Sequence, residues 1–232
     1  MASITEYRSP RILAYLAIVP LAGLLSIAIL NIILGFGEIV LPREIVLDNG
    51  ARGSAWFTIM YVLSLAELPL RVLAAIFFLV WLFRIFKNLG PTKVRNSEHP
   101  ASWAIGVWFI PILNLFKPHQ VMQQAWRDTD PDIDPTANYA LAKPEFNSFI
   151  LTWWIAYIAS NVIARIGNRI AENLPDTKAA LVIMIISFIA AAPALMAIQL
   201  VWEITRRQED RSQKILNVHE DATPPPPPSF DG

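Results

Sequence analysis

Cysteine is absent from this chain of 232 residues, and charged residues are scarce, at 16% of the composition. The lack of cysteine excludes disulfides, thiolate metal sites and a cysteine nucleophile. No lysine- and arginine-rich block occurs, and 19 basic residues balance 19 acidic ones, so nucleic-acid binding is not expected. The common hydrolase, metalloprotease and nucleotide-binding motifs are missing as well. The sequence therefore indicates no cofactor and no metal, and it favours a non-enzymatic protein without excluding an unfamiliar intramembrane enzyme.

Apolar residues are abundant instead. They make up 54% of the chain, and the mean hydropathy is +0.42, which is more apolar surface than a soluble domain of this size can bury. A membrane span needs about 20 consecutive apolar residues, and runs of that length predict an all-α integral membrane bundle with four transmembrane helices. The predicted spans are residues 12–36, 55–83, 147–168 and 179–202.

A shorter apolar segment, residues 101–116, is interrupted by Pro111 and Asn114. As a helix it would reach roughly 24 Å, which is short of a hydrocarbon core of about 30 Å. If this segment does not cross, about thirteen basic residues lie on the cytoplasmic side and about five outside, whereas a crossing divides them about equally. We therefore predict a re-entrant or interfacial, proline-broken helix at this position, with five spans as the alternative.

This topology predicts a multi-pass protein of the plasma (cytoplasmic) membrane with both termini in the cytoplasm. The expected parts are a cytoplasmic N-terminus at residues 1–10, a membrane domain at 11–205 and a cytoplasmic, proline-rich tail at 206–232. The charged stretch 203–217 could extend the last helix into the cytoplasm, until the prolines Pro224 to Pro228 end any helix.

The middle of the chain carries a distinctive order of tryptophan, proline and polar residues. Its members are Trp81, Arg84, Asn88, Trp103, Trp108, Pro111, Asn114, Pro118, Gln120, Val121, Trp126 and Arg127. In order and spacing this pattern resembles an uncharacterised bacterial membrane family known as domain of unknown function 4328. The resemblance implies a multi-pass membrane location, and it implies no activity, substrate or catalytic residue.

Two charged residues lie within the second predicted span. Glu67 and Arg71 stand one helical turn apart, with the acid on the N-terminal side, which is the favourable order for an ion pair. A structural pair that orients two helices is the simpler interpretation. The alternative is a binding site for an anionic substrate or a lipid headgroup, in which Arg165 and Arg169 at the end of the third span approach the pair.

The segment from Trp103 to Trp126 gathers further candidate site residues. Amide groups at membrane depth need hydrogen-bond partners, because hydrocarbon offers none. A break in the helix that faces a cavity would supply them and would form a ligand pocket or a gate. The alternative is an interfacial platform with tryptophans at the level of the headgroups. The residues concerned are Trp108, Pro111, Asn114, Pro118, Gln120 and Trp126.

Two other patterns are weaker. Asp128, Asp130, Asp132 and Asp134 alternate as at the start of a calcium loop, but Ile133 occupies the position that needs glycine, so no metal site is predicted. The run Pro224 to Pro228 favours a polyproline helix that a protein partner could bind, or a simple spacer.

Three functions remain open from the sequence. The first is a scaffold or accessory membrane subunit, which contacts membrane lipid and could form a homo-oligomer. The second is a small transporter or channel component with a polar site at Pro111, Asn114, Glu67 and Arg71. The third is an intramembrane enzyme that acts on lipid, and only scattered polar residues support it.

Overall fold

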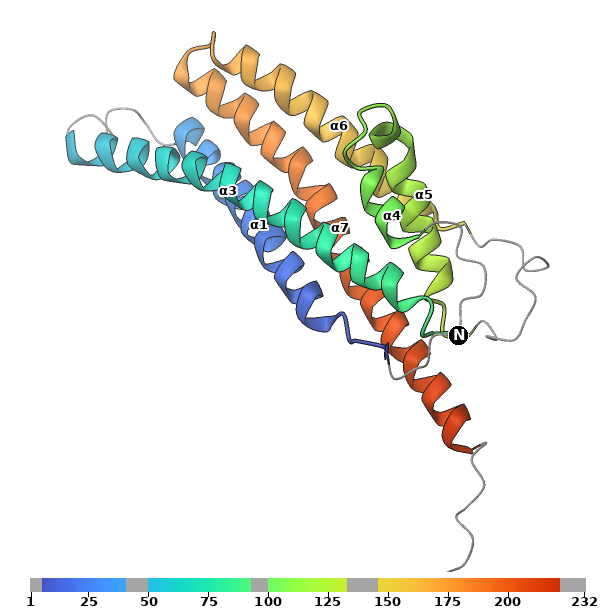
Figure 1. Ribbon diagram of the computed structural model, residues 1–232. Coiled ribbons are helices and arrows are strands. Elements are labelled where there is room, and N and C mark those ends of the chain that lie inside the picture. The colour runs from blue at the N-terminus through green and yellow to red at the C-terminus, as the bar shows by residue number, and fades with distance from the viewer. Residues whose placement is uncertain (1–5, 41–49, 93–99, 133–145, 222–232) are drawn as a thin grey trace, which may run out of the picture.

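The computed structural model describes residues 6–40, 50–92, 100–132 and 146–221, and within these ranges it contains helices and turns but no β-strand (Figure 1). The all-α prediction is therefore confirmed. Two short helices separate the second and third of four long ones along the chain. In order, the helices are α1 (Arg11–Val40), α3 (Gly50–Asn88), α4 (Ala101–Gly106), α5 (Leu113–Asp128), α6 (Ser148–Ala171) and α7 (Asp176–Asp221).

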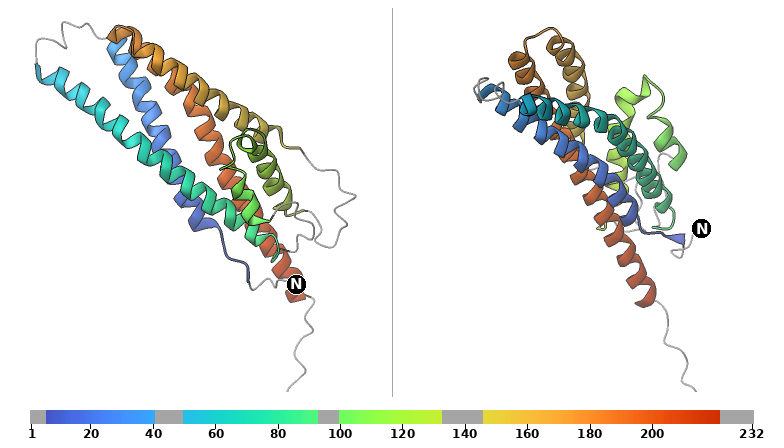
Figure 2. Two further views of the ribbon diagram at one scale, coloured as in Figure 1. Left: turned by 45° about the horizontal axis from the view of Figure 1, so that its top comes forward. Right: turned by 90° about the vertical axis from the view of Figure 1, so that its left-hand side faces the viewer.

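The four long helices pack side by side in the order α3, α1, α7, α6, and each runs antiparallel to its neighbour (Figures 1 and 2). Of the short helices, α4 packs on α3 and α5 packs on α6. One end of the bundle consequently holds the start of α1, the end of α3, the start of α6 and the end of α7. We call it the hairpin end, because α4 and α5 form a hairpin there, which is described below. The opposite end is called the far end.

All four long helices contain a stretch that is long and apolar enough to cross a membrane. These stretches are Arg11–Gly37, Val62–Asn88, Ser148–Ala171 and Thr177–Asn217. Many large apolar side chains point away from the bundle, including Ile12, Val19, Leu68 and Phe188, each at least 68% exposed. Hydrocarbon matches such a surface and water does not. The chain is therefore a membrane protein with four spanning helices, as predicted.

The broken segment 101–116 forms no fifth span. Its first part is the six-residue helix α4, and turns at residues 107–112 lead into α5, so that Pro111 lies in the turns and Asn114 in the first turn of α5. The chain rises into the bundle through α4 and returns through α5 (Figure 1). Two contacts show this reversal. Trp108 packs on Phe78 in the second half of α3. Asp130, just after α5, shares the partner Arg211 with Thr92, which follows the end of α3. We call residues 101–128 the hairpin.

The best-packed part of the molecule lies at the hairpin end. Side chains from α3, the hairpin, α6 and α7 meet there and are at most 1% exposed. They include Trp81, Leu82, Ile85, Val107, Met122, Ile150 and Leu200. The indole N–H of Trp81 donates a hydrogen bond of 2.9 Å to the Thr205 hydroxyl in this core, which satisfies the largest buried polar side chain there. These buried side chains form a packed layer, which we call the base, and the hairpin lies on it between α3 and α6.

Candidate functional site

A cavity of about 560 Å³ opens above this base, bounded by all four long helices and the tip of the hairpin. This volume lies within the usual range of small-molecule sites. Outer helices α3 and α6 form its two sides, and α1 and α7 form its back. Apolar side chains provide most of the lining, with a few polar groups among them, so the cavity has the mixed chemistry of a binding site.

Short side chains on α7 create much of this space. Ser187, Ala190, Ala194 and Ala197 all line the cavity. Small residues at such spacing are typical of close helix packing in membranes. In the folded chain they also border the cavity, where a small side chain leaves volume that a leucine or phenylalanine would fill.

The α3 wall carries an ion pair. Arg71 donates from Nε to a carboxylate oxygen of Glu67 over 3.1 Å, and its terminal nitrogen contacts the same oxygen. Pro69 lies between the two residues without ending the helix. The pair carries no net charge, and it lies toward the far end, since Arg71 precedes Phe78 by seven residues or roughly 10 Å of helix.

Aromatic rings form the floor of the cavity, on the side of the hairpin. The Phe78 ring contacts Trp108 at 5.4 Å and Trp153 at 6.2 Å between centroids. Trp154 contacts Trp108 edge-on at 5.6 Å and stacks on Tyr157 at 5.3 Å. The Trp154 N–H donates to the Leu115 carbonyl over 2.9 Å, so this ring fixes the hairpin tip against α6. The hairpin and two spanning helices together build the floor.

Three buried polar atoms around this floor have no hydrogen-bond partner among the residues that the structure describes. They are the indole nitrogens of Trp108 and Trp153 and the amide oxygen of Asn114. All three residues line the cavity. Buried polar groups without partners are uncommon, and each one calls for a physical explanation.

The structure brings together four of the residues that the sequence singled out: Glu67, Arg71, Trp108 and Asn114 line the cavity. Arg165 and Arg169 do not line it and lie exposed on α6. A shared positive cluster with Arg71 is therefore absent from the lining.

The remaining candidates lie on the hairpin outside the cavity. Pro111 is exposed in the turns, and Pro118 is buried within α5. Gln120 is exposed and accepts a hydrogen bond from Lys117 over 2.9 Å. Trp126 lies under the guanidinium of Arg207, 4.1 Å from the ring centroid. These residues shape and anchor the hairpin rather than the cavity.

Several lining residues were not identified as candidates from the sequence. Asn31 on α1 and Asn161 on α6 are amides within apolar runs, which was the available signal. Trp153 and Ser160 carried no such signal, because a tryptophan or a serine in a spanning helix has many possible neighbours. Only packing places them beside the hairpin.

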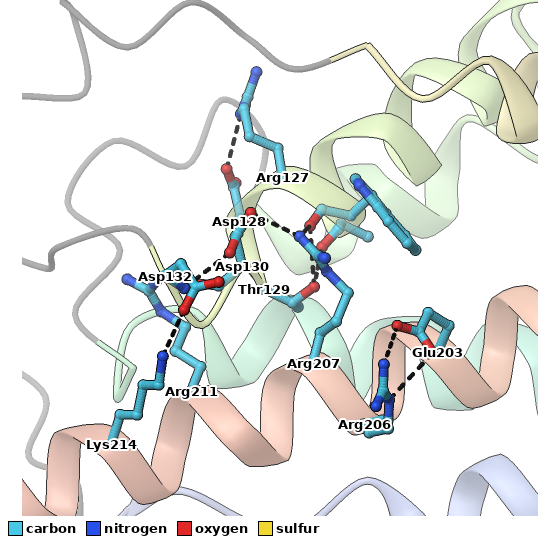
Figure 3. A network of polar contacts seen from close by, with 12 residues as sticks. Arg127, Asp128, Thr129, Asp130, Asp132, Glu203, Arg206, Arg207, Arg211 and Lys214 are labelled. Carbon is cyan, nitrogen blue, oxygen red and sulfur yellow. Dashed lines mark hydrogen bonds and ion pairs between the residues drawn. The ribbon is translucent and has the colours of Figure 1, made fainter.

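A second group of polar residues joins the end of the hairpin to the part of α7 that follows its apolar run (Figure 3). Arg207 pairs with Asp130 at 2.8 Å, and Asp128 pairs with Arg127 at 3.0 Å. Arg211, which is only 2% exposed, donates to the backbone carbonyls of Thr92 and Asp130. We call this group the α7 clamp; it anchors the end of α5.

The clamp also explains the alternating aspartates. Asp130 and Asp132 pair with Arg207 and Lys214, and Asp134 lies outside the described residues. The hydrogen bond and charge of Lys214 hold the pKa of Asp132 below its usual range. Nowhere in the described ranges do three or more acidic or histidine side chains gather to hold a metal ion.

The N-terminal segment meets α3 and α7 at the same end. Asn88 donates to the Arg8 carbonyl and to Gln208, each over 2.9 Å, and Gln208 donates to the Ile85 carbonyl. Burial raises the pKa of Tyr7, and the nearby Glu209 carboxylate adds to the effect. The hydroxyl of this tyrosine therefore stays protonated at neutral pH.

Comparison with protein families gives a match over residues 47–206 to the domain of unknown function DUF4328. The chain belongs to this family. Comparisons with curated proteins and with solved structures gave no match. The matched range of this DUF4328 protein runs from α3 to Arg206 on α7, so it includes every part of the cavity except the α1 wall. The family description names no activity, and the site must be interpreted from its own chemistry.

Proposed function

We propose that this DUF4328 protein binds a membrane lipid in the cavity between α3 and α6. The observation that carries the proposal is the cavity of about 560 Å³, lined by one chain at the level of its spanning helices. Hydrocarbon-rich molecules are the most abundant ligands at this depth. The apolar lining suits their chains, and the few polar groups suit a head group.

Access from the bilayer is the second support. The main helix contacts are α3 with α1, α1 with α7, and α7 with α6, so α3 and α6 are the outer members of the row. Tyr157 on α6 and Arg71 on α3 line the cavity and are also exposed. A lipid could therefore enter sideways between the two outer helices, without passing through water.

The base of the cavity favours binding over conduction. Below the floor, Trp81, Leu82 and Val107 are fully buried and tightly packed. A transporter or channel would need a path through this layer, and such a path would require the hairpin to leave its seat. A flux through proteoliposomes that depends on Arg71 and Asn114 would favour that alternative.

Filling the cavity tests the proposal. Ala194 lines the cavity, whereas Ala192, two residues earlier on the same helix, is exposed and does not line it. Ala194→Phe should remove the lipid that co-purifies with the protein, measured by native mass spectrometry, and Ala192→Phe should retain it. Equal lipid retention in both variants, with unchanged thermal stability, would contradict the proposal.

The orientation in the membrane is also part of the proposal. Basic residues gather at the hairpin end, including Arg84, Lys87, Arg206 and Arg211, whereas Arg165, Arg169 and Lys178 lie toward the far end. The positive-inside rule then supports a cytoplasmic hairpin end, with both termini inside, in the plasma membrane.

An interaction with a protein partner stays a separate proposal. The prolines Pro224 to Pro228 lie outside the described residues and would recruit a partner or a second copy to the cytoplasmic face. Deletion of residues 222–232 should abolish co-purification of that partner while the lipid content stays unchanged. A partner that persists after the deletion would argue against this role for the tail.

A further inference from the structure

Resting on the proposed lipid site, we infer that the ligand is an uncharged lipid whose head group bears carbonyl oxygens and lies on the aromatic floor. The basis is the hydrogen-bonding chemistry of the floor. Trp108 and Trp153 each supply an indole N–H, which can donate and cannot accept. Neither nitrogen has a partner among the described residues, and Trp153 is only 4% exposed.

Two unpaired donors at one place need acceptor oxygens. The lining residues come from five segments, yet none of them offers an acceptor to either nitrogen within the described part of the chain. Hydrocarbon tails cannot supply one, so an acyl chain on the floor would leave both N–H groups unsatisfied. Carbonyl oxygens of a bound head group would satisfy both.

The head group should carry no charge. The charged residues of the lining are Glu67 and Arg71, which neutralise each other about 10 Å nearer the far end. At the floor the lining consists of apolar, indole, phenol and amide groups. A phosphate or carboxylate buried there would have no counter-charge, which opposes burial strongly, whereas a neutral carbonyl meets no such penalty.

Two sources share this chemistry. A diacylglycerol offers two ester carbonyls and one hydroxyl, and the hydroxyl could donate to the unpartnered amide oxygen of Asn114. A quinone offers two carbonyls on a flat ring, which could stack on the aromatic rings of the floor. The quinone has no donor for Asn114, so this residue distinguishes the two sources.

Binding should also move the rings. The indole nitrogens of Trp108 and Trp153 are covered by neighbouring atoms, so each ring must rotate to present its N–H to a ligand. Because indole emission depends on hydrogen bonding and polarity, the intrinsic fluorescence should change on binding, and most of this change should come from these two residues.

The experiment uses the full-length protein in nanodiscs of phosphatidylcholine. Tryptophan emission is followed while dioctanoylglycerol, decylubiquinone or, as a charged comparison, dioctanoyl-phosphatidylglycerol is added. Trp108→Phe and Trp153→Phe keep an aromatic ring and remove the N–H donor, together with the rest of the five-membered ring that carries it. Trp202→Phe is the matched control, since Trp202 lies beyond the cavity and is 49% exposed beside Tyr15.

We expect a neutral lipid to bind, and Trp108→Phe and Trp153→Phe to weaken its affinity about 5- to 10-fold each, with no change for Trp202→Phe. Asn114→Leu should weaken dioctanoylglycerol only, if a glyceride is the ligand. If Asn114→Leu has no effect while decylubiquinone depends on both tryptophans, the ligand is a quinone.

Tighter binding of the phosphatidylglycerol, or unchanged affinity in both tryptophan variants, would overturn the inference. If Ala194→Phe then still abolishes lipid binding, the lipid site itself stands and only the chemistry assigned to its floor is wrong. If Ala194→Phe has no effect on any lipid, the proposed function fails as well.

Discussion

At the scale of single residues, the ion pair on α3 shows how a membrane span tolerates charge. Glu67 and Arg71 are 38% and 50% exposed at the side chain in the protein alone, and they lie between the cavity and the bilayer. Each charge compensates the other, so the pair as a whole enters the membrane more easily than either member. The two residues therefore act as a unit.

Removing one member should accordingly cost more than removing both. We expect Glu67→Gln to lower the thermal unfolding temperature in nanodiscs more than the double change Glu67→Gln with Arg71→Gln, because the single variant leaves an uncompensated arginine. Differential scanning fluorimetry of the three proteins measures this. A double variant that is the least stable of the set would contradict the pairing argument.

Arg211 is the most deeply buried arginine of the α7 clamp. It is 2% exposed, and its guanidinium donates to the carbonyl of Thr92 over 3.2 Å and to that of Asp130 over 2.6 Å. We expect Arg211→Met to destabilise the folded protein by about 2–4 kcal/mol, because one buried and one partly buried carbonyl lose charge-assisted hydrogen bonds. Arg211→Lys should restore little, since one ammonium cannot reproduce the planar fork.

Chemical denaturation in detergent micelles measures this loss. The exposed Arg206, paired with Glu203 one turn away, provides the control. Arg206→Met should change the stability by less than about 1 kcal/mol, as is usual for exposed ion pairs. A similar small effect of Arg211→Met would show that the clamp does not hold the hairpin.

At the scale of helices, α6 and α7 approach each other closely at Gly167. A Cβ atom added to this glycine would lie 2.5 Å from Cδ1 of Ile186. Such close approach through a small residue is typical of helix packing in membranes. The position therefore sets how α6 lies against α7, and with it the α6 wall of the cavity.

A larger residue at position 167 should be harmful, and a smaller one opposite should repair it. We expect Gly167→Val to lower the thermal unfolding temperature, because the flexible end of Ile186 can move aside for one carbon atom but not for a branched side chain. Adding Ile186→Ala should recover a substantial part of the loss. Equal melting temperatures for the single and double variants would indicate that the helices do not meet here.

At the scale of the whole molecule, the described helices place the start of α1, the start of α6 and the end of α7 at one end (Figure 2). Reporter fusions after Asp134 and at the C-terminus should therefore be found on the same side of the membrane, and the positive-inside rule predicts the cytoplasmic side. A fusion within residues 41–49 should report the opposite side. Different compartments for the first two reporters would contradict the four-span arrangement.

Much of this architecture could be predicted from the chain. Apolar length alone predicts four spans, and the shortness of residues 101–116, with Pro111 and Asn114, predicts a segment that does not cross. The spacing of Glu67 and Arg71 predicts their ion pair, because neighbours on a single helix follow from its pitch. Features contained in one helix can therefore be predicted from the sequence.

The cavity could not be predicted from the sequence in this way. Trp153 becomes a floor residue only because the hairpin tip packs against α6, and Ala194 becomes a lining residue only because α3 and α6 are held apart. Arg165 and Arg169, which the alternative interpretation of the sequence brought near the ion pair, do not line the cavity, and spacing along one helix does not say which way that helix faces another.

The sequence by itself thus determined that this protein lies in a membrane, how many spans it has and that residues 101–116 are interrupted, because length and polarity act locally along the chain. Only the tertiary structure decided that the hairpin seats between α3 and α6 on a packed base and leaves a cavity above it. That outcome depends on how side chains far apart in the chain fit together, and on where small residues such as Ala194 and Ser187 leave space.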